Sequence, residues 1–227
     1  MNAETRSRPQ IRVAWLSTKT AKWIVGIVLA IPFVLLLNDV RIELIQPGAG
    51  LGPDPGEALV DRLGTWSIRI LYLTLLVSSV ARLLKVPVLI QHRRTFGLWA
   101  FTYVVLHLAA YFSALAGFDL NVVLGDFSKR PYIIVGLVAL CLLIPLAITS
   151  TRGWQRRLGL NWRRLHRIVY VAAILALIHL WMQEKASFFD TFMYGSILFL
   201  LFIERLVGAV QRLRRKSVAT QAAGEST

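Results

Sequence analysis

Histidines are the residues of this chain whose type and position suggest chemistry. His107 lies in the apolar run WAFTYVVLHLAAYF, and both His166 and His179 lie in RLHRIVYVAAILALIHLW. The fourth, His92, precedes two arginines. Ionisable side chains are rare in long apolar runs, and those that occur there tend to be functional. A neutral imidazole in such a place can hydrogen-bond a neighbouring helix or ligate a transition metal.

A hydrogen bond to a neighbouring helix explains any one of these histidines as well as a metal does. Three of them in two runs favour a shared role, because neutral imidazole is a good axial ligand for haem iron. Cofactors also fill the space between packed helices, and alanines and large apolar residues surround these histidines. For His92, which stands among arginines, we favour a solvated or headgroup-bound position instead.

The spacing of the histidines predicts which of them act together. His166 and His179 are thirteen residues apart, which on a helix means about 20 Å along the axis and about 140° around it. They therefore do not share a face of an ideal helix. His107 lies at a depth similar to that of His179, so we predict that these two form a bis-histidine pair. His166 is left for a second haem with another ligand, for contact with a flavin, or for proton transfer.

Membrane-spanning helices are the elements that would position these residues. The 227 residues are 56% hydrophobic and have a mean hydropathy of +0.59, whereas soluble domains are about 45–50% apolar. A helix needs ~20 apolar residues to cross a bilayer. The stretches that approach this length are Trp23–Leu37, Trp66–Leu84, Phe96–Ala116, Tyr132–Thr149, His166–Met182 and Phe189–Val207. We therefore expect an all-α fold, a bundle of six transmembrane helices.

The charges between these stretches predict their direction. The net charge is +14, and 20 of the 26 basic residues fall in the N-terminal segment and in 82–95, 150–167 and 204–227. The other connections hold six basic residues and nine of the 12 acidic ones. Basic residues collect on the cytoplasmic side of a membrane. We therefore expect both termini in the cytoplasm, and a first helix that is not cleaved.

The same pattern predicts the domain organisation. We expect a cytoplasmic segment 1–22, a haem-binding transmembrane domain 23–207 and a basic, disordered cytoplasmic tail 208–227. Residues 38–64, rich in Gly, Pro and acids, read as an external loop with turns. No internal repeat is evident, and the connections are too short for a nucleotide-binding unit of ~30 residues. The single cysteine excludes an intrachain disulfide, and the lack of C-x-x-C-H excludes covalent haem attachment.

Several motifs, taken in order, resemble one known family. They are LGPDPGEAL, HRRTFGLWAFTYVVLH, KRPYIIVG and TSTRGWQRRLGLNWRRLHRIVYVAAILALIHLW. Over roughly residues 20–206 the chain is similar to MsrQ, the haem-binding membrane subunits of bacterial methionine-sulfoxide reductase systems. That family belongs to the ferric reductase-like transmembrane superfamily. The resemblance implies a multi-pass protein of the bacterial inner membrane that holds one or two b-type haems, with FMN as a further cofactor. It also implies a cytosolic flavin reductase as electron donor and a periplasmic molybdopterin enzyme, MsrP, as acceptor.

The resemblance carries over to particular residues. The haem histidines of the family correspond to His107, His166 and His179. Arg93 and Arg94 adjoin the third apolar stretch, where guanidinium groups could hold a flavin phosphate or dock an acidic donor. Topology and lipid headgroups explain most of the basic residues equally well. We predict no catalytic residue, since the chain lacks a dehydrogenase domain of its own.

One departure from the superfamily bears on the number of haems. NADPH oxidases carry two histidines on the third helix, whereas the third stretch here has only His107. Gly97 and Tyr111 stand where a second histidine is expected. The sequence therefore argues against a second bis-histidine haem.

Three functions remain open at this point. The first is the electron-transfer subunit just described. The second is a stand-alone transmembrane ferric or quinone reductase, which would use the same haem with a different acceptor. The third is a small non-redox transporter with proton-linked histidines. The third has little support, because no chain of Asp or Glu runs through the apolar stretches.

Overall fold

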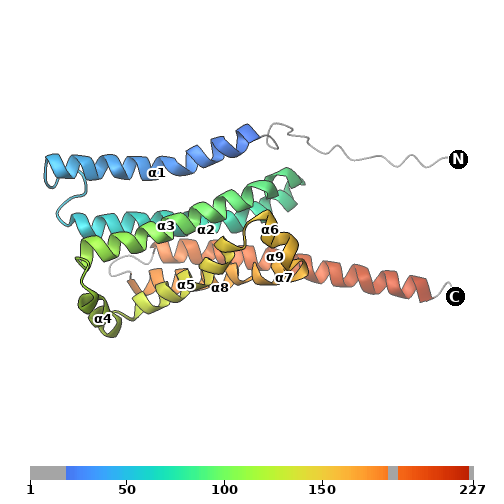
Figure 1. The fold of residues 1–227 in the computed structure, drawn as a ribbon. Coiled ribbons are helices and arrows are strands. Elements are labelled where there is room, and N and C mark those ends of the chain that lie inside the picture. The colour runs from blue at the N-terminus through green and yellow to red at the C-terminus, as the bar shows by residue number, and fades with distance from the viewer. Residues whose placement is uncertain (1–18, 184–188, 225–227) are drawn as a thin grey trace. The chain divides into compact units, whose positions relative to one another are not determined.

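The computed structural model describes residues 19–183 and 189–224, and every regular element in these ranges is a helix (Figure 1). Two compact units are distinguished, Met1–Lys185 and Ala186–Thr227. Six of the described helices are long and apolar enough to cross a membrane. The prediction of an all-α fold with six candidate spans is thereby confirmed.

The first unit holds all helices but the last. They are α1 (Lys19–Ile45), α2 (Pro55–Leu83), the 3₁₀ helix η2 (Pro87–His92), α3 (Arg93–Ala110), the π-helical turn η3 (Tyr111–Leu115), α4 (Leu120–Lys129), α5 (Pro131–Ile148), α6 (Arg152–Leu158), α7 (Leu160–Leu165) and α8 (Ile168–Gln183). The second unit holds α9 (Phe189–Gly224). Most of the predicted N-terminal segment, 1–18, lies outside the described residues.

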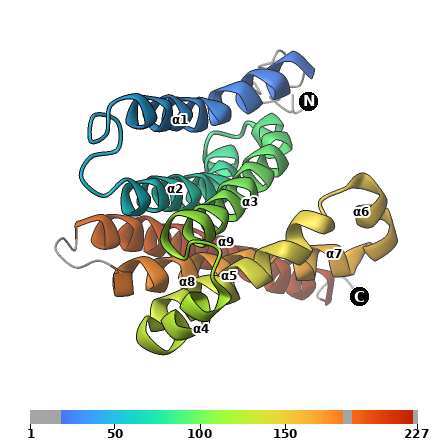
Figure 2. The ribbon, with the colours of Figure 1, turned by 60° about the vertical axis from the view of Figure 1, so that its left-hand side comes forward.

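Helix α2 forms the centre of the first unit. About 56% of its most apolar window is buried, against 17–22% for the other candidate spans. It packs most extensively against α3, and α5 packs in the same way against α8 (Figure 2). The two pairs meet through α3 with α5 and through α2 with α8. These four helices therefore form a bundle core in which α3 and α8 carry His107 and His179.

The connection between α1 and α2 is shorter than predicted. Helix α1 continues to Ile45 and α2 begins at Pro55, so most of the expected loop 38–64 is helical. The Glu43 carboxylate accepts the backbone N–H groups of Gly48, Gly50 and Leu51. Asp54 caps α2 by accepting the N–H of Glu57, and proline at the first helical position is favourable. Acidic residues of this segment had indicated a loop. Two of them, Glu43 and Asp54, instead form the hydrogen bonds at the end of α1 and at the start of α2.

Tyr103 ties α1 to α3 inside the membrane-spanning region. Its hydroxyl donates to the carbonyl of Leu29 at 2.8 Å and accepts from the N–H of Phe33 at 3.1 Å. In a regular helix these two backbone groups would bond to each other, four residues apart. The hydroxyl thus enters the hydrogen-bond ladder of α1 beside Pro32, where a helix is already weakened.

The second unit differs from the prediction at its end. Helix α9 extends to Gly224, through most of the segment 208–227 that the sequence led us to expect as disordered. Arginine, lysine, glutamine and alanine dominate this segment, and all four have high helix propensity. Residues 225–227 lie outside the described part of the chain.

Candidate functional site

His107 and His179 face each other between α3 and α8. Their ring centroids are 6.2 Å apart, and the planes of the two rings lie at 86°. Both side chains are half-buried. Each stands in the C-terminal half of its helix. Helices α3 and α8 lie diagonally across the bundle, because both pack against α2 and α5, and the two rings point into the space between them. The structure thus brings together the two histidines that the sequence paired.

Backbone carbonyls of two further helices orient the rings. Nδ1 of His107 lies 2.9 Å from the carbonyl oxygen of Val60 on α2, and Nδ1 of His179 lies 2.7 Å from that of Tyr132 on α5. Because a carbonyl oxygen only accepts, each Nδ1 carries the proton and donates it. Nε2 is then the nitrogen with a lone pair, which is the arrangement found in metal-ligating histidines.

The distance between the rings suits two ligands of one iron. Metal–imidazole bonds are about 2 Å, so two ligating nitrogens on opposite sides of a metal stand about 4 Å apart. Each nitrogen lies roughly 1 Å from its ring centre, which puts the ring centres about 6 Å apart. The 6.2 Å between His107 and His179 agrees with that value. The donor set, two neutral imidazoles in an apolar helical core, is also one that haem iron accepts.

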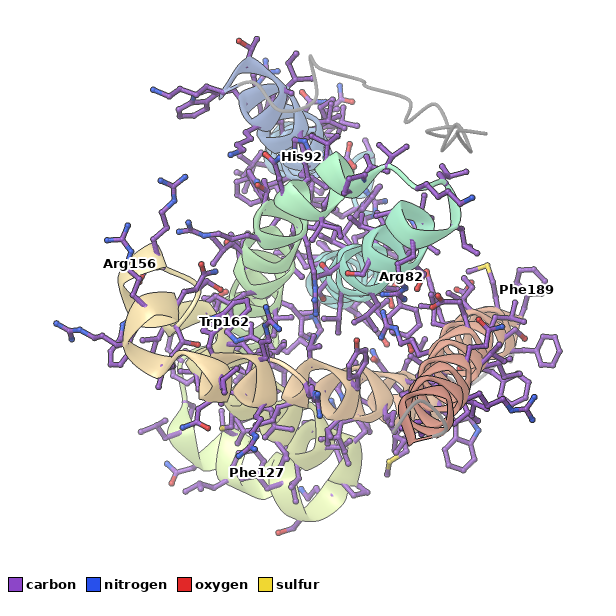
Figure 3. The ribbon with its side chains drawn as sticks, turned by 90° about the vertical axis from the view of Figure 1, so that its right-hand side faces the viewer. Arg82, His92, Phe127, Arg156, Trp162 and Phe189 are labelled. Carbon is purple, nitrogen blue, oxygen red and sulfur yellow. The ribbon has the colours of Figure 1, made fainter. Side chains whose placement is uncertain are left out.

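His166 lies away from this pair, in the turn between α7 and α8. Its ring stacks on Trp162, with centroids 4.0 Å apart and planes at 29°. Nδ1 lies 3.1 Å from the Trp162 carbonyl, and Nε2 is buried. The Trp162 indole donates to the carbonyl of Thr149 at 2.9 Å, which fixes the stack against the end of α5 (Figure 3). The ring also interacts with the backbone of Leu146, so His166 is held between the turn that follows α7 and the end of α5.

The two arginines that follow His92 take different surroundings. Arg93 is close enough to His166 for their charges to interact. Arg94 instead lines an open cavity of about 280 Å³ between α1 and α3. The other residues lining it are Lys22, Gln91, Thr95, Leu98 and Trp99. Two cations and three further donors make this cavity suitable for a phosphate.

The expectation for His92 is wrong. It was expected among solvated arginines, yet it is only 3% exposed, at the end of the 3₁₀ helix η2. Figure 3 labels His92 beside the start of α3, among the other helices, whereas Arg156 on α6 lies at the outer edge of the view. The 3₁₀ helix η2 packs against both α2 and α3, so its last residue lies among helices and not in solvent.

Sequence reasoning missed the groups that hold the two rings. They are main-chain carbonyls, which every residue carries, so the residue type does not identify them. The partial signal was a glycine in each helix, Gly64 and Gly136, four residues after each accepting carbonyl. Among the described residues there is no cluster of three or more His, Cys, Asp or Glu side chains that could hold a metal ion.

Comparisons with known proteins give a consistent result. Residues 63–177 match the family model of the ferric reductase like transmembrane component. That range includes His107 and His166 and ends two residues before His179.

Curated relatives extend the match over most of the chain. A Caulobacter vibrioides protein is 43% identical over 157 residues, 69% of this chain and 75% of its own. A Xanthomonas campestris protein is 40% identical over 187 residues, 82% of this chain and 85% of its own. Each is named "Protein-methionine-sulfoxide reductase heme-binding subunit MsrQ".

Proposed function

The chain belongs to the ferric reductase-like transmembrane family, among the MsrQ haem-binding subunits, and from this premise we propose its route of electron transfer. Electrons enter from a cytosolic flavin reductase and cross the membrane through b-type haem. They leave to a periplasmic molybdenum enzyme of the MsrP type, which repairs methionine sulfoxide in envelope proteins. The protein itself is a multi-pass subunit of the bacterial inner membrane with cytoplasmic termini.

The observation that carries this proposal is the facing pair of imidazoles. The ring centroids of His107 and His179 are 6.2 Å apart inside the bundle of α2, α3, α5 and α8, and each ring is held through Nδ1 by a main-chain carbonyl. These two residues would hold the haem by Nε2. A bound haem supplies one-electron chemistry in a region that ions do not cross. A proton-linked transporter has no comparable need for two rings fixed in this way.

This chain's own residues do three things at the pair. The carbonyls of Val60 and Tyr132 fix the tautomer of each ring and increase the basicity of the opposite nitrogen. The apolar helices α2, α3, α5 and α8 surround the pair and would keep water away from a haem held there. The bundle also keeps the two rings in register, so oxidation and reduction need little rearrangement of the protein.

His166 and the arginines serve the entry of electrons in this proposal. His166 would contact a second haem or a flavin at this end of the bundle, and Arg93 lies near it. We place the phosphate of FMN in the cavity lined by Lys22 and Arg94. Exposed arginines of α6 and α7, such as Arg156, would attract an acidic donor.

Absorption spectroscopy of the purified protein tests the haem. The oxidised and dithionite-reduced spectra should show b-type bands, and haem and flavin should be quantified per polypeptide. A colourless preparation from cells supplied with haem precursor would contradict the proposal.

The acceptor requires a separate experiment. The reduced protein should be oxidised rapidly by an MsrP-type molybdenum enzyme in the presence of methionine sulfoxide. Ferric chelates and quinones serve as comparison acceptors. Rapid oxidation by these, with none by the molybdenum enzyme, would instead identify a stand-alone ferric or quinone reductase.

A further inference from the structure

The two histidines of the pair are held by the same local pattern, which occurs twice in the chain. Val60 accepts from His107, and Tyr132 accepts from His179; in both cases the histidine follows its acceptor by 47 residues. A glycine stands four residues after each acceptor, Gly64 on α2 and Gly136 on α5. The second set follows the first by 72 residues at every position.

The packing of the helices repeats in the same way. Helix α2 pairs with α3 as α5 pairs with α8, and the contacts between the pairs are reciprocal, α3 with α5 and α8 with α2. This is the contact pattern of two units related by a twofold axis. Buried positions correspond at the same 72-residue offset: Ser67 and Ala139, Ile68 and Leu140, Leu71 and Leu143, Thr74 and Leu146, Ala100 and Ala172. The sequence did not reveal this repeat, because the corresponding positions are both buried but carry different residue types.

Helix geometry explains why a glycine recurs at this spacing. The carbonyl of residue i already accepts the N–H of residue i+4 in an α-helix. A second donor that reaches the same carbonyl must therefore pass beside residue i+4. A Cβ on Gly64 would stand 3.0 Å from Cε1 and 3.1 Å from Nδ1 of His107. On Gly136 it would stand 2.8 Å from Nδ1 and 2.9 Å from Cε1 of His179.

Each of these two glycines lowers the stability of its helix, so its position needs a compensating benefit. Glycine inside a helix is less stable than alanine by about 1 kcal/mol, so an alanine would strengthen both helices if space allowed. Space does not allow it, because the ring against each glycine is fixed by its bond to the carbonyl. The close approach of ring and backbone is what these two glycines provide.

We propose that Gly64 and Gly136 are positioning residues of the haem site. They let each imidazole lie against a helix backbone and donate Nδ1–H to the carbonyl one turn earlier, which sets the plane of the ring and the donor strength of Nε2. The inference rests on the proposed haem binding and adds to it two residues that touch neither iron nor substrate. The tighter contact at Gly136 makes it the more sensitive of the two.

The test compares Gly136→Ala and Gly64→Ala in the full-length, haem-loaded protein. An added methyl group pushes the ring off its carbonyl, which weakens the Nδ1–H bond and so the donation to iron. We expect a higher reduction potential, an altered low-spin ferric EPR spectrum, and about 10- to 100-fold weaker haem binding. The changes should be larger for Gly136→Ala. The EPR spectrum depends on the angle between the imidazole planes, which a general loss of stability does not alter.

Two glycine variants serve as matched controls. Gly97→Ala lies on α3, the helix of His107, and its Cβ would meet only Thr74 Cγ2 at an ordinary 3.6 Å. Gly125→Ala lies on α4 with nothing within 4 Å. Both should keep the potential and EPR spectrum of the unchanged protein.

The outcomes separate this inference from the proposed function. Unchanged spectra and potentials in both Gly64→Ala and Gly136→Ala would overturn the positioning role while haem binding stands. Equal shifts in Gly97→Ala would overturn it too, because any added methyl would then suffice. Absence of haem from the unchanged protein would instead overturn the proposed function. If Gly136→Ala does not accumulate in the membrane, Gly64→Ala, with its looser contact, decides the question.

Discussion

The two ends of the four-helix core are built from the same repeat and differ in what they hold. At one end the repeat is kept, since His107 and His179 occupy equivalent positions and both donate to a carbonyl. At the other end it is broken, because the position equivalent to His166, 72 residues earlier, is Arg94. One end therefore offers two imidazoles, and the other offers one imidazole and two guanidinium groups.

In the proposed route of electron transfer, the two ends would have different roles. Two equivalent ligands suit a haem that stays in place with little rearrangement, which is what a carrier through the membrane needs. A single imidazole with cations nearby suits contact with anionic partners, such as a flavin phosphate or an acidic surface. We therefore propose that the symmetric end holds the haem and that the asymmetric end receives the electrons.

The largest effect should come from removing a ligand at the symmetric end. We expect His107→Ala and His179→Ala each to abolish the bis-histidine haem, because a single imidazole cannot keep iron six-coordinate. His166→Ala should retain that haem. Reduced-minus-oxidised spectra and haem quantification on purified variants measure all three. Normal haem in both of the first two variants would disprove the pairing.

The sequence predicted this pair from little information. Histidines are conspicuous in apolar runs, and helices that cross a membrane in the same direction bring equal depths together, so His107 and His179 could be matched by depth alone. The carbonyls of Val60 and Tyr132 could not be found in this way, because every residue carries a carbonyl and only packing selects one. Gly64 and Gly136 were visible as glycines in apolar stretches, but their purpose needs the position of the opposing ring.

Errors at the helix ends have a different physical cause. The composition of 38–64 predicted a loop, but most of this segment is helical. The carboxylates of Glu43 and Asp54 accept backbone N–H groups, and a helix lies on each side of the short connection. His92 was predicted to be solvated because two arginines follow it in the sequence. It is instead buried at the end of the 3₁₀ helix η2. The pattern of charges predicts on which side of a membrane a connection lies. It does not predict at which residue a helix ends, because that depends on individual backbone hydrogen bonds.

A smaller effect is expected from the asymmetric end. Arg94→Gln should weaken FMN binding by roughly 10- to 100-fold, the equivalent of one charge-assisted hydrogen bond to a phosphate. The haem spectrum should not change, since Arg94 lines the cavity beside Lys22 and not the histidine pair. Flavin titration by fluorescence measures the affinity.

Arg156→Gln is the matched control for that variant. It removes the same charge from an exposed position on α6, outside the residues that line the cavity. Equal losses of flavin affinity in the two variants would point to general attraction by the basic surface. An unchanged affinity in Arg94→Gln would remove the flavin phosphate from this cavity.

The smallest effect should come from Tyr103, which lies on α3 one turn before His107 and contacts α1 instead of the site. Tyr103→Phe deletes the hydroxyl between the Leu29 carbonyl and the Phe33 N–H. Two buried groups left unpaired would cost about 1–3 kcal/mol each. These two groups are natural partners four residues apart in α1, however, and can bond to each other once the hydroxyl is gone. We therefore expect a loss of only about 1 kcal/mol, with unchanged haem spectra, measured by thermal unfolding in detergent. A loss of haem in Tyr103→Phe would mean that α1 and the histidine pair are coupled through α3.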